Sequence, residues 1–147
     1  LGYVSREELP VFYSMAEIFV YPSIYEGFGL PVLEAMACGT PVITSCVSSL
    51  PEIGGSAVLY TDPHSVDQLT AYMVRLCSNF EERQKYRRLG LGQSAKFSWE
   101  KTARKTVDLF ETMIWTICLS INKTSGPSLI LRTTCESQTL SNNVVLI

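Results

Sequence analysis

The stretch YPSIYEGFGLPVLEAMACGTPVI, residues 21–43, constrains the fold of this 147-residue chain more than any other part of the sequence. Ile18–Tyr21 is a compact β-prone run closed by a proline, which predicts a strand buried on both faces. Pro31–Cys38 begins with proline and is followed by Gly39, which is typical of a helix. Pro41–Thr44 predicts a second strand. Strand, helix and strand fit within about 30 residues, the size of one βαβ unit with a right-handed crossover.

The flanking sequence extends this alternation of apolar runs and amphipathic stretches. Ala57–Tyr60 predicts a third strand, and Gly90 and Gly92 are expected to weaken the end of one helix. Three strands make a thin sheet, whereas a doubly wound domain has about five or six, so we expect the second half of a larger domain. The sequence predicts the α/β class, a Rossmann-like parallel sheet with flanking helices. Further helices are expected after the capping signals at Ser5–Glu8, Asp62–Pro63, Asn79 and Ser98.

The composition excludes several classes of protein. A net charge of -2 argues against a coat for nucleic acid, and a hydrophobic fraction of 46% excludes a disordered chain. No apolar stretch reaches the roughly 20 residues that a membrane-spanning helix needs. The five cysteines are widely spaced and odd in number, which indicates reduced thiols in a cytoplasmic protein rather than disulfides or a zinc site.

The charges are unevenly distributed along the chain. Residues 1–74 contain one basic and eight acidic residues, whereas residues 75–105 contain nine basic and three acidic residues. A basic helix face in the second segment has two interpretations, a solvated surface or peripheral contact with the cytosolic face of an anionic membrane. We favour the solvated surface, because the basic run is short and interrupted. The face consists of Arg83, Lys85, Arg87 and Arg88.

The loop between the first strand and its helix has the chemistry of an anion site. Neither Gly29 nor Leu30 offers a side-chain oxygen to the first amides of the helix, so those N–H groups are free for a ligand. Uncapped amides at the carboxyl end of a parallel strand are where α/β proteins bind phosphate. Gly27 and Gly29 are expected to take unusual φ values and to let the backbone approach the ligand.

Two carboxylates frame this loop. Glu34 lies one turn into the helix, where its oxygens suit the vicinal diol of a ribose, and Glu26 precedes the helix, where it can face a sugar or a departing phosphate. Taken singly, each glutamate is more simply explained as a helix-dipole partner or a solvated charge. The combined pattern of glycines, uncapped helix and paired carboxylates favours ligand binding.

The motif EGFGLPVLEAMACGTPVI resembles the signature of the retaining glycosyltransferases of family 4, the glycogen-synthase-like group with the two-domain GT-B architecture. The resemblance extends over GYVSREELPVFYSMAEIFVYPS, LPEIGG, AVLYTDP and FSWEKTA, or about Leu1 to Met113. It implies that residues 1–114 are the second half of a GT-B C-terminal, nucleotide-sugar-binding domain. Residues 115–147 are poor in charge and rich in Ser, Thr and Asn, and we expect them to form an irregular or disordered tail.

The resemblance implies transfer of a hexose from a UDP-, GDP- or ADP-sugar to a hydroxyl of a glycan, lipid or small-molecule acceptor. Retention of the anomeric configuration and no obligatory metal are implied as well. Glu26 resembles the glutamate near the transferred sugar, and Glu34 resembles the one that binds the donor ribose. The remaining donor-binding residues implied by the resemblance are Gly27, Phe28, Gly29 and Leu30 at the phosphate and sugar, with Val4 and, less specifically, Tyr3 near the base.

The resemblance also places the acceptor domain, a histidine and a pyrophosphate-gripping Arg/Lys pair upstream of Leu1. We therefore expect the chain by itself to be an inactive fragment. Two other hypotheses stay open: a non-catalytic module that binds a nucleotide sugar or a partner, and another GT-B enzyme such as a nucleotide-sugar epimerase. His64 is interpreted as a surface residue, and the stripe of Trp99, Phe110 and Met113 as core.

Overall fold

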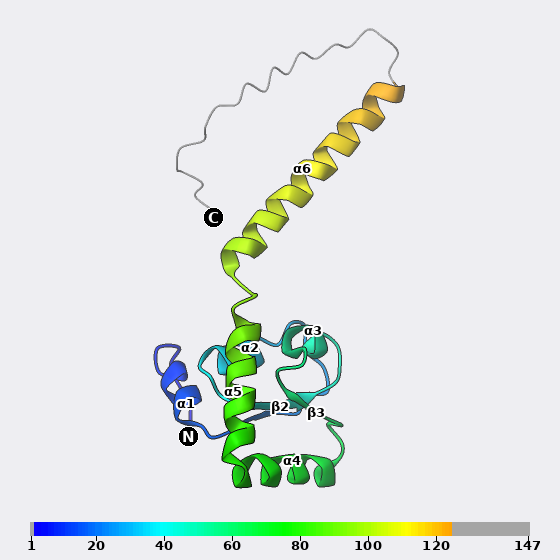
Figure 1. The fold of residues 1–147 in the computed structure, drawn as a ribbon. Helices are drawn as coiled ribbons and strands as arrows, with labels where there is room; N and C mark the ends of the chain where they lie inside the picture. Colours follow the sequence, from blue (N-terminus) through cyan, green and yellow to red (C-terminus); the bar gives the residue numbers. More distant parts are fainter. Residues whose placement is uncertain (1, 125–147) are drawn as a thin grey trace. The chain divides into compact units, whose positions relative to one another are not determined.

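The computed structural model describes residues 2–124, with residues 118–124 described by their backbone alone. The chain divides into two units, residues 1–102 and 103–147. The first unit holds a parallel sheet of three strands in the order β1-β2-β3 (Figure 1). The strands are β1 (Phe19–Tyr21), β2 (Val42–Ser45) and β3 (Leu59–Thr61). The α/β class and the parallel sheet with flanking helices are therefore confirmed.

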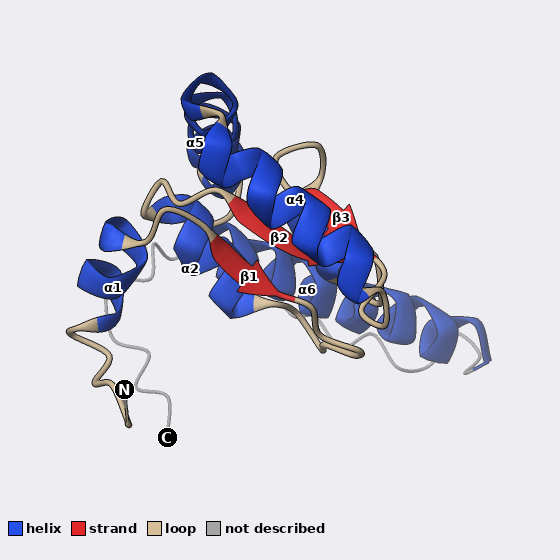
Figure 2. Cartoon of the chain, turned by 90° about the horizontal axis from the view of Figure 1, so that it is seen from below, coloured by secondary structure: helices blue, strands red, loops and turns tan. Residues whose placement is uncertain are grey.

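Helices cover both faces of the sheet (Figure 2). Helix α2 (Leu30–Ala37) forms the βαβ crossover between β1 and β2 and packs with α3 (Leu50–Gly54) on one face. Helix α4 (Val66–Ser78) packs on the other face. Helix α1 (Leu9–Met15) precedes β1, and α5 (Phe80–Ser94) packs against both α2 and α4.

Successive side chains of each strand point to opposite faces of the sheet, which divides the interior into two apolar cores. Val42 belongs to the core beneath α2 and α3, whereas its neighbour Ile43 belongs to the core beneath α4. Leu50, from α3, and Leu76, from α4, are fully buried on these two sides. All four residues of β2 are buried, as expected for the central strand of a parallel sheet covered on both faces.

Side-chain caps fix three helix starts. Asn79 Oδ1 accepts from the N–H of Glu82 at 3.0 Å, and Ser98 Oγ accepts from the N–H of Lys101 at 3.1 Å, as predicted for α5 and for α6. The expected cap of α4 was wrong: Ser65, not Asp62, accepts from the N–H of Gln68, at 3.3 Å. Asp62 Oδ1 instead accepts from the N–H of His64 at 2.9 Å in the preceding turn, because Pro63 comes too early to begin the helix.

Two features of the helices in the first unit go beyond what the sequence predicted. Helix α3 was not predicted, although Pro51 and Glu52 supply its first turn. Helix α5 runs through both of its glycines to Ser94. Gly90 is buried where α5 packs on α2, and a Cβ on it would make ordinary van der Waals contact with the Met36 side chain at 3.4 Å.

The basic stretch of α5 is not uniformly a solvated face. Arg83 Nη1 donates to the carbonyls of Leu76 and Cys77, each at 2.7 Å, and its Nε lies 2.9 Å from Glu17 Oε2. The guanidinium thereby satisfies the last carbonyls of α4, which have no partner within their own helix. One of the four basic residues of the stretch therefore serves the fold.

Helix α6 (Trp99–Thr124) continues past residue 114, so residues 115–124 are helical and not irregular as expected. Hydroxyl groups do not disrupt it, because Thr112 Oγ1 and Thr116 Oγ1 each donate to the carbonyl four residues back, both at 2.8 Å. The rest of the expected tail lies outside the described residues. Within its own unit, Trp99 is 79% exposed, which contradicts a core position for it, whereas packing of Phe110 and Met113 as core stays a prediction. No helix among residues 2–124 meets the length and hydropathy needed to cross a membrane.

Candidate functional site

The loop of residues 22–29 joins the carboxyl end of β1 to the start of α2. Two hydroxyl groups of β2 fix its beginning: Thr44 Oγ1 donates to the carbonyl of Tyr21 at 2.8 Å, and Ser45 Oγ donates to the carbonyl of Ser23. Both hydroxyl-bearing residues are buried. The sheet thus holds the loop at its carboxyl edge, where α/β proteins bind their ligands.

Glu26 is held in this loop through one of its two carboxylate oxygens. Its Oε1 accepts from the hydroxyl of Tyr21 and, at 3.1 Å, from Ser23 Oγ. The hydrogen bond to Glu26 raises the pKa of Tyr21, and partial burial adds to this effect. Within the described part of the chain, Oε2 of this half-buried glutamate accepts no hydrogen bond, so it is available to a ligand.

Four consecutive amides at the entry to α2 have no hydrogen-bond partner among the described residues. Val32 N–H and Leu33 N–H both donate to the carbonyl of Gly29, at 3.1 and 3.3 Å, and Pro31 has no N–H. No side chain caps the helix. Among residues 2–124, no hydrogen bond reaches the remaining amides of this segment, which belong to Gly27, Phe28, Gly29 and Leu30. These N–H groups can bind an anion or sugar oxygens, and the helix dipole adds to that capacity.

The two loop glycines differ in what they contribute. Gly29 has φ +103° and a Cβ there would lie 2.8 Å from Leu50 Cδ2. Gly27 has no such φ, and a Cβ on it would meet no atom within 4 Å. The expectation of unusual φ values therefore holds for Gly29 and is wrong for Gly27, because the chain turns sharply only at the residue that precedes α2.

Glu34 lies on the exposed side of α2. Its Oε2 accepts from the hydroxyl of Tyr13, on α1, at 3.2 Å. Burial, with the neighbouring Glu34 carboxylate as a second cause, raises the pKa of Tyr13 to about 12. Both side chains line a groove of about 560 Å³ between α1, α2 and the segment after α5, and Arg6 brings a positive charge to the same groove. The lining of the groove is mostly apolar, and Glu34 offers an acceptor to ligand hydroxyl groups within it.

The tyrosines that hold the two glutamates belong to one aromatic row. Tyr13 packs edge-on against Phe19 with ring centroids 5.2 Å apart, and Phe19 stacks on Tyr21 at 5.8 Å. The sequence predicts no role at the site for either tyrosine and places Tyr21 only in a strand. Their contacts with the two glutamates become visible only when α1 and β1 lie beside α2.

The structure does not bring all the expected donor-binding residues to one place. Phe28 and Leu30 flank Gly29 and are 45% and 42% exposed. Val4 is half-buried, and Tyr3 is 96% exposed. Neither of these two lines the groove beside Glu34, so their contact with a nucleotide base stays a prediction.

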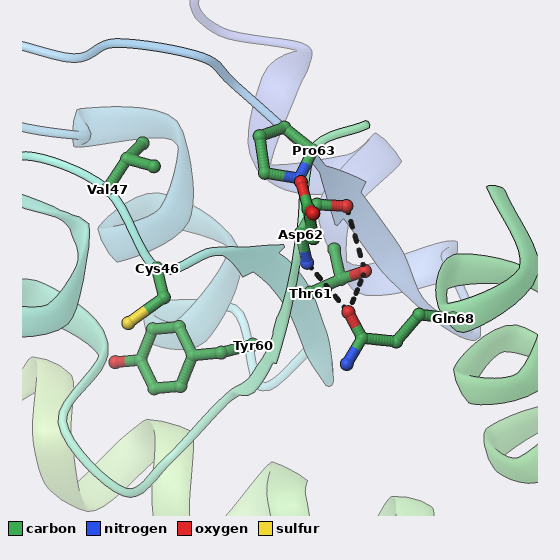
Figure 3. A pocket seen from close by; sticks show the side chains of 7 residues that line it. All are labelled: Cys46, Val47, Tyr60, Thr61, Asp62, Pro63 and Gln68. Atoms are coloured by element: carbon green, nitrogen blue, oxygen red, sulfur yellow. Dashed lines mark hydrogen bonds between the residues drawn. The ribbon is translucent and has the colours of Figure 1, made fainter. Parts of the chain in front are cut away.

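A second pocket, of about 410 Å³, opens at the carboxyl ends of β2 and β3 (Figure 3). Gln68 Oε1 accepts there from the N–H of Asp62 at 2.7 Å and from Thr61 Oγ1 at 3.1 Å (Figure 3). Burial raises the pKa of Tyr60 to about 12, and its hydroxyl donates to the carbonyl of Gly55 at 2.9 Å. These polar groups are hydrogen-bonded within the chain, so we assign them a structural role and do not take this pocket as the candidate site. The described residues contain no cluster of three or more metal-ligating side chains.

Residues 1–92 match the family described as glycosyl transferases group 1. The chain belongs to this family. The matched range includes β1, α2 and the loop with its free amides, so family membership applies to the candidate site itself. Membership also supports the assignment as a transferase, with an architecture of the Rossmann-like, GT-B type.

Two curated relatives are mannosyltransferases. The chain is 46% identical over 113 residues to O-antigen chain mannosyltransferase B of Escherichia coli, covering 77% of this chain and 30% of that protein. It is 38% identical over 115 residues to MMP alpha-(1->4)-mannosyltransferase of Mycolicibacterium hassiacum, covering 76% of this chain and 28% of that protein. The chain therefore spans less than a third of the length of either relative.

A solved structure confirms the fold assignment. Sucrose-phosphate synthase from Thermosynechococcus elongatus matches with a TM-score of 0.71 at 33% sequence identity. The match covers 79% of this chain and 30% of that protein. The described βαβ unit is thus the arrangement found in a glycosyltransferase of known structure.

Proposed function

We propose that this chain is the donor-binding part of a retaining glycosyltransferase of family 4 that uses a nucleoside diphosphate sugar. The observation that carries the proposal is the row of free N–H groups from Gly27 to Leu30, flanked by two carboxylates that are each held by a tyrosine. This arrangement can receive a diphosphate between a sugar on the Glu26 side and a ribose on the Glu34 side.

Each part of the site has a distinct role in the proposed reaction. The amides of Phe28, Gly29 and Leu30 bind the distal phosphate and meet the negative charge that develops as the sugar leaves. We expect the amides and the helix dipole to do this without an obligatory metal. Glu26 Oε2 accepts from hydroxyls of the transferred sugar, while Glu34 accepts from the ribose diol. Gly27 leaves room for the sugar, and Val4 contacts the base.

We propose mannose as the transferred sugar, because both relatives described above are named as mannosyltransferases. A hydroxyl of a glycan, lipid or small molecule would accept it. We place the protein in the cytoplasm, with peripheral contact with a membrane left open. The free thiols of the described Cys38, Cys46 and Cys77 support a reducing compartment. Because the chain covers 30% of its E. coli relative, we expect donor binding without turnover from the chain alone.

Calorimetric titration with UDP-glucose, GDP-mannose, ADP-glucose and the matching free diphosphates tests the proposal. Glu34→Gln should weaken the binding of both the free diphosphate and the sugar nucleotide, because both ligands contain the ribose. Glu26→Gln should weaken the binding of the sugar nucleotide alone, because only that ligand carries the sugar. Each loss should be about tenfold, the lower end of the value of hydrogen bonds to a charged group, since both glutamates are partly solvated.

Glu52→Gln is the matched control, because Glu52 is an exposed glutamate in the first turn of α3. Equal losses for both ligands in Glu26→Gln, or no binding of any donor by the unmodified chain, would contradict the proposal. In the longer protein that contains this chain, Glu26→Ala and Glu34→Ala should abolish sugar transfer. Unchanged transfer would favour the non-catalytic module.

A further inference from the structure

Two serines in the segment between β2 and α3 bind the backbone of the candidate site loop. The N–H of Glu26 donates to Ser48 Oγ at 3.0 Å, and Ser48 Oγ donates to the carbonyl of Glu26 at 2.8 Å. Ser49 Oγ lies 3.1 Å from the carbonyl of Glu26 and 2.8 Å from the carbonyl of Phe28. We refer to Ser48 and Ser49 together as the serine clasp.

The backbone of Ser48 shows that its side chain has a specific use. Ser48 has φ +46°, and among the described residues it is the only non-glycine residue with a positive φ. A side chain in this region of φ is unfavourable, and glycine would adopt the same conformation without strain. Such strain persists where the surrounding structure requires it, often at functional sites. Glycine could not supply the hydroxyl that pairs with both polar groups of Glu26.

The clasp determines which way the loop amides point. In a planar trans peptide, the C=O and the following N–H point in opposite directions. The carbonyls of Glu26 and Phe28 point at the serines, so the N–H groups of Gly27 and Gly29 point away from them. These N–H groups are among those without a partner in the described residues.

We propose that Ser48 and Ser49 are positioning residues for donor binding, which orient the amides of Gly27 and Gly29 toward the donor by holding the carbonyls of Glu26 and Phe28. This inference rests on the proposed function, because it assumes that the loop binds a nucleoside diphosphate sugar. It assigns a role to residues outside the motif between Glu26 and Ile43.

Three substitutions in the full chain separate positioning from stability. Ser48→Gly removes both the hydroxyl and the strain, Ser48→Ala removes the hydroxyl alone, and Ser49→Ala removes the second half of the clasp. Ser56→Ala is the control, because Ser56 is exposed and its hydroxyl forms no hydrogen bond within the described part of the chain. Affinity for GDP-mannose, UDP-glucose and ADP-glucose is measured by calorimetry, and Tm is measured on the same samples.

We expect each of the three substitutions, Ser48→Gly, Ser48→Ala and Ser49→Ala, to lower the affinity for the donor by about five- to tenfold. This loss is equivalent to one or two hydrogen bonds between neutral groups. Ser48→Gly should keep or raise Tm, whereas Ser48→Ala should lower it. A purely structural role would move affinity and Tm together. In ¹⁵N–¹H spectra, donor should shift the Gly27 and Gly29 amides of the unmodified chain, with smaller shifts in the variants.

Donor binding by Ser48→Gly and Ser49→Ala that equals that of the unmodified chain would overturn the inference while leaving the proposed function intact. A loss of affinity in Ser48→Ala that is absent in Ser48→Gly would also overturn it, since strain alone would then explain the effect. If the unmodified chain binds none of the three donors, the proposed function fails, and the positioning role fails with it.

Discussion

Gly29→Ala should destabilise the fold through two separate effects at the start of α2. The first is conformational, because Gly29 has φ +103° and ψ 40°, where an alanine is strained. The second is steric, because the new Cβ would lie 2.8 Å from Leu50 Cδ2. Leu50 is fully buried in the core beneath α2 and α3, so it cannot move aside freely.

The two effects give an expected magnitude. A non-glycine residue in such a region costs about 1–3 kcal/mol. Forcing an extra methyl group into a packed core costs about 1–3 kcal/mol more. The free energy of unfolding should therefore fall by about 2–6 kcal/mol, a large part of the roughly 5–15 kcal/mol that stabilises a typical domain. For a unit of this size, the lower value already corresponds to a fall in Tm of about 8–16 °C.

Urea unfolding followed by circular dichroism measures this change, and Gly27→Ala is its matched control. A Cβ on Gly27 meets no atom within 4 Å, and its φ is not positive, so the free energy of unfolding should change by less than about 1 kcal/mol. A free energy of unfolding for Gly29→Ala within about 0.5 kcal/mol of the value for Gly27→Ala would refute the reasoning. It would mean that α2 can begin with an ordinary backbone conformation.

Three further predictions concern the rest of the first unit. Asn79→Ala should lower the free energy of unfolding by about 1 kcal/mol in urea titrations, because it removes the cap of the Glu82 N–H at 3.0 Å. Arg83→Met should lower it by about 1.5–3 kcal/mol by leaving the carbonyls of Leu76 and Cys77 unpaired, whereas Arg88→Met, at an exposed position, should have almost no effect. Burial raises the pKa of Tyr60 from 10.0 to about 12, so the folded chain keeps a proton that the unfolded chain loses, and stability should fall as the pH rises from 10 to 12. Tyr60→Phe should flatten that fall in pH-dependent thermal melts, and an unchanged slope would contradict the assignment.

The βαβ unit could be predicted from the sequence because its signals are local. A proline at the start of α2, Gly39 with φ +76° after its end, and a β-prone run on either side all act within a few residues. The free amides of the loop follow from the same local logic, since Gly29 carries no capping oxygen. The observed strands differ from the predicted ones only at their ends.

The parts that escaped prediction depend on contacts between distant segments. By itself Gly90 is expected to weaken the end of a helix, but in the structure it lies inside α5, where that helix packs against Met36 on α2. Ser49 is a plausible cap for α3, yet its hydroxyl is used by the carbonyls of Glu26 and Phe28. Tyr13 hydrogen-bonds Glu34 across 21 positions in the sequence. No local pattern contains such pairings.

The requirements of the fold alone do not explain the loop that precedes α2. Helices α4, α5 and α6 each begin with a serine or asparagine whose side chain caps an amide, so this sequence readily uses caps worth about 1 kcal/mol each. Helices α1, α2 and α3 have no such cap, and at α2 the four N–H groups of residues 27–30 are also unpaired among the described residues. At the same edge, Ser48 holds a strained backbone in order to pair with Glu26. Stability is thus given up at two neighbouring segments, both within the residues that match the glycosyl transferases group 1 family, and the donor binding that we propose would account for both costs.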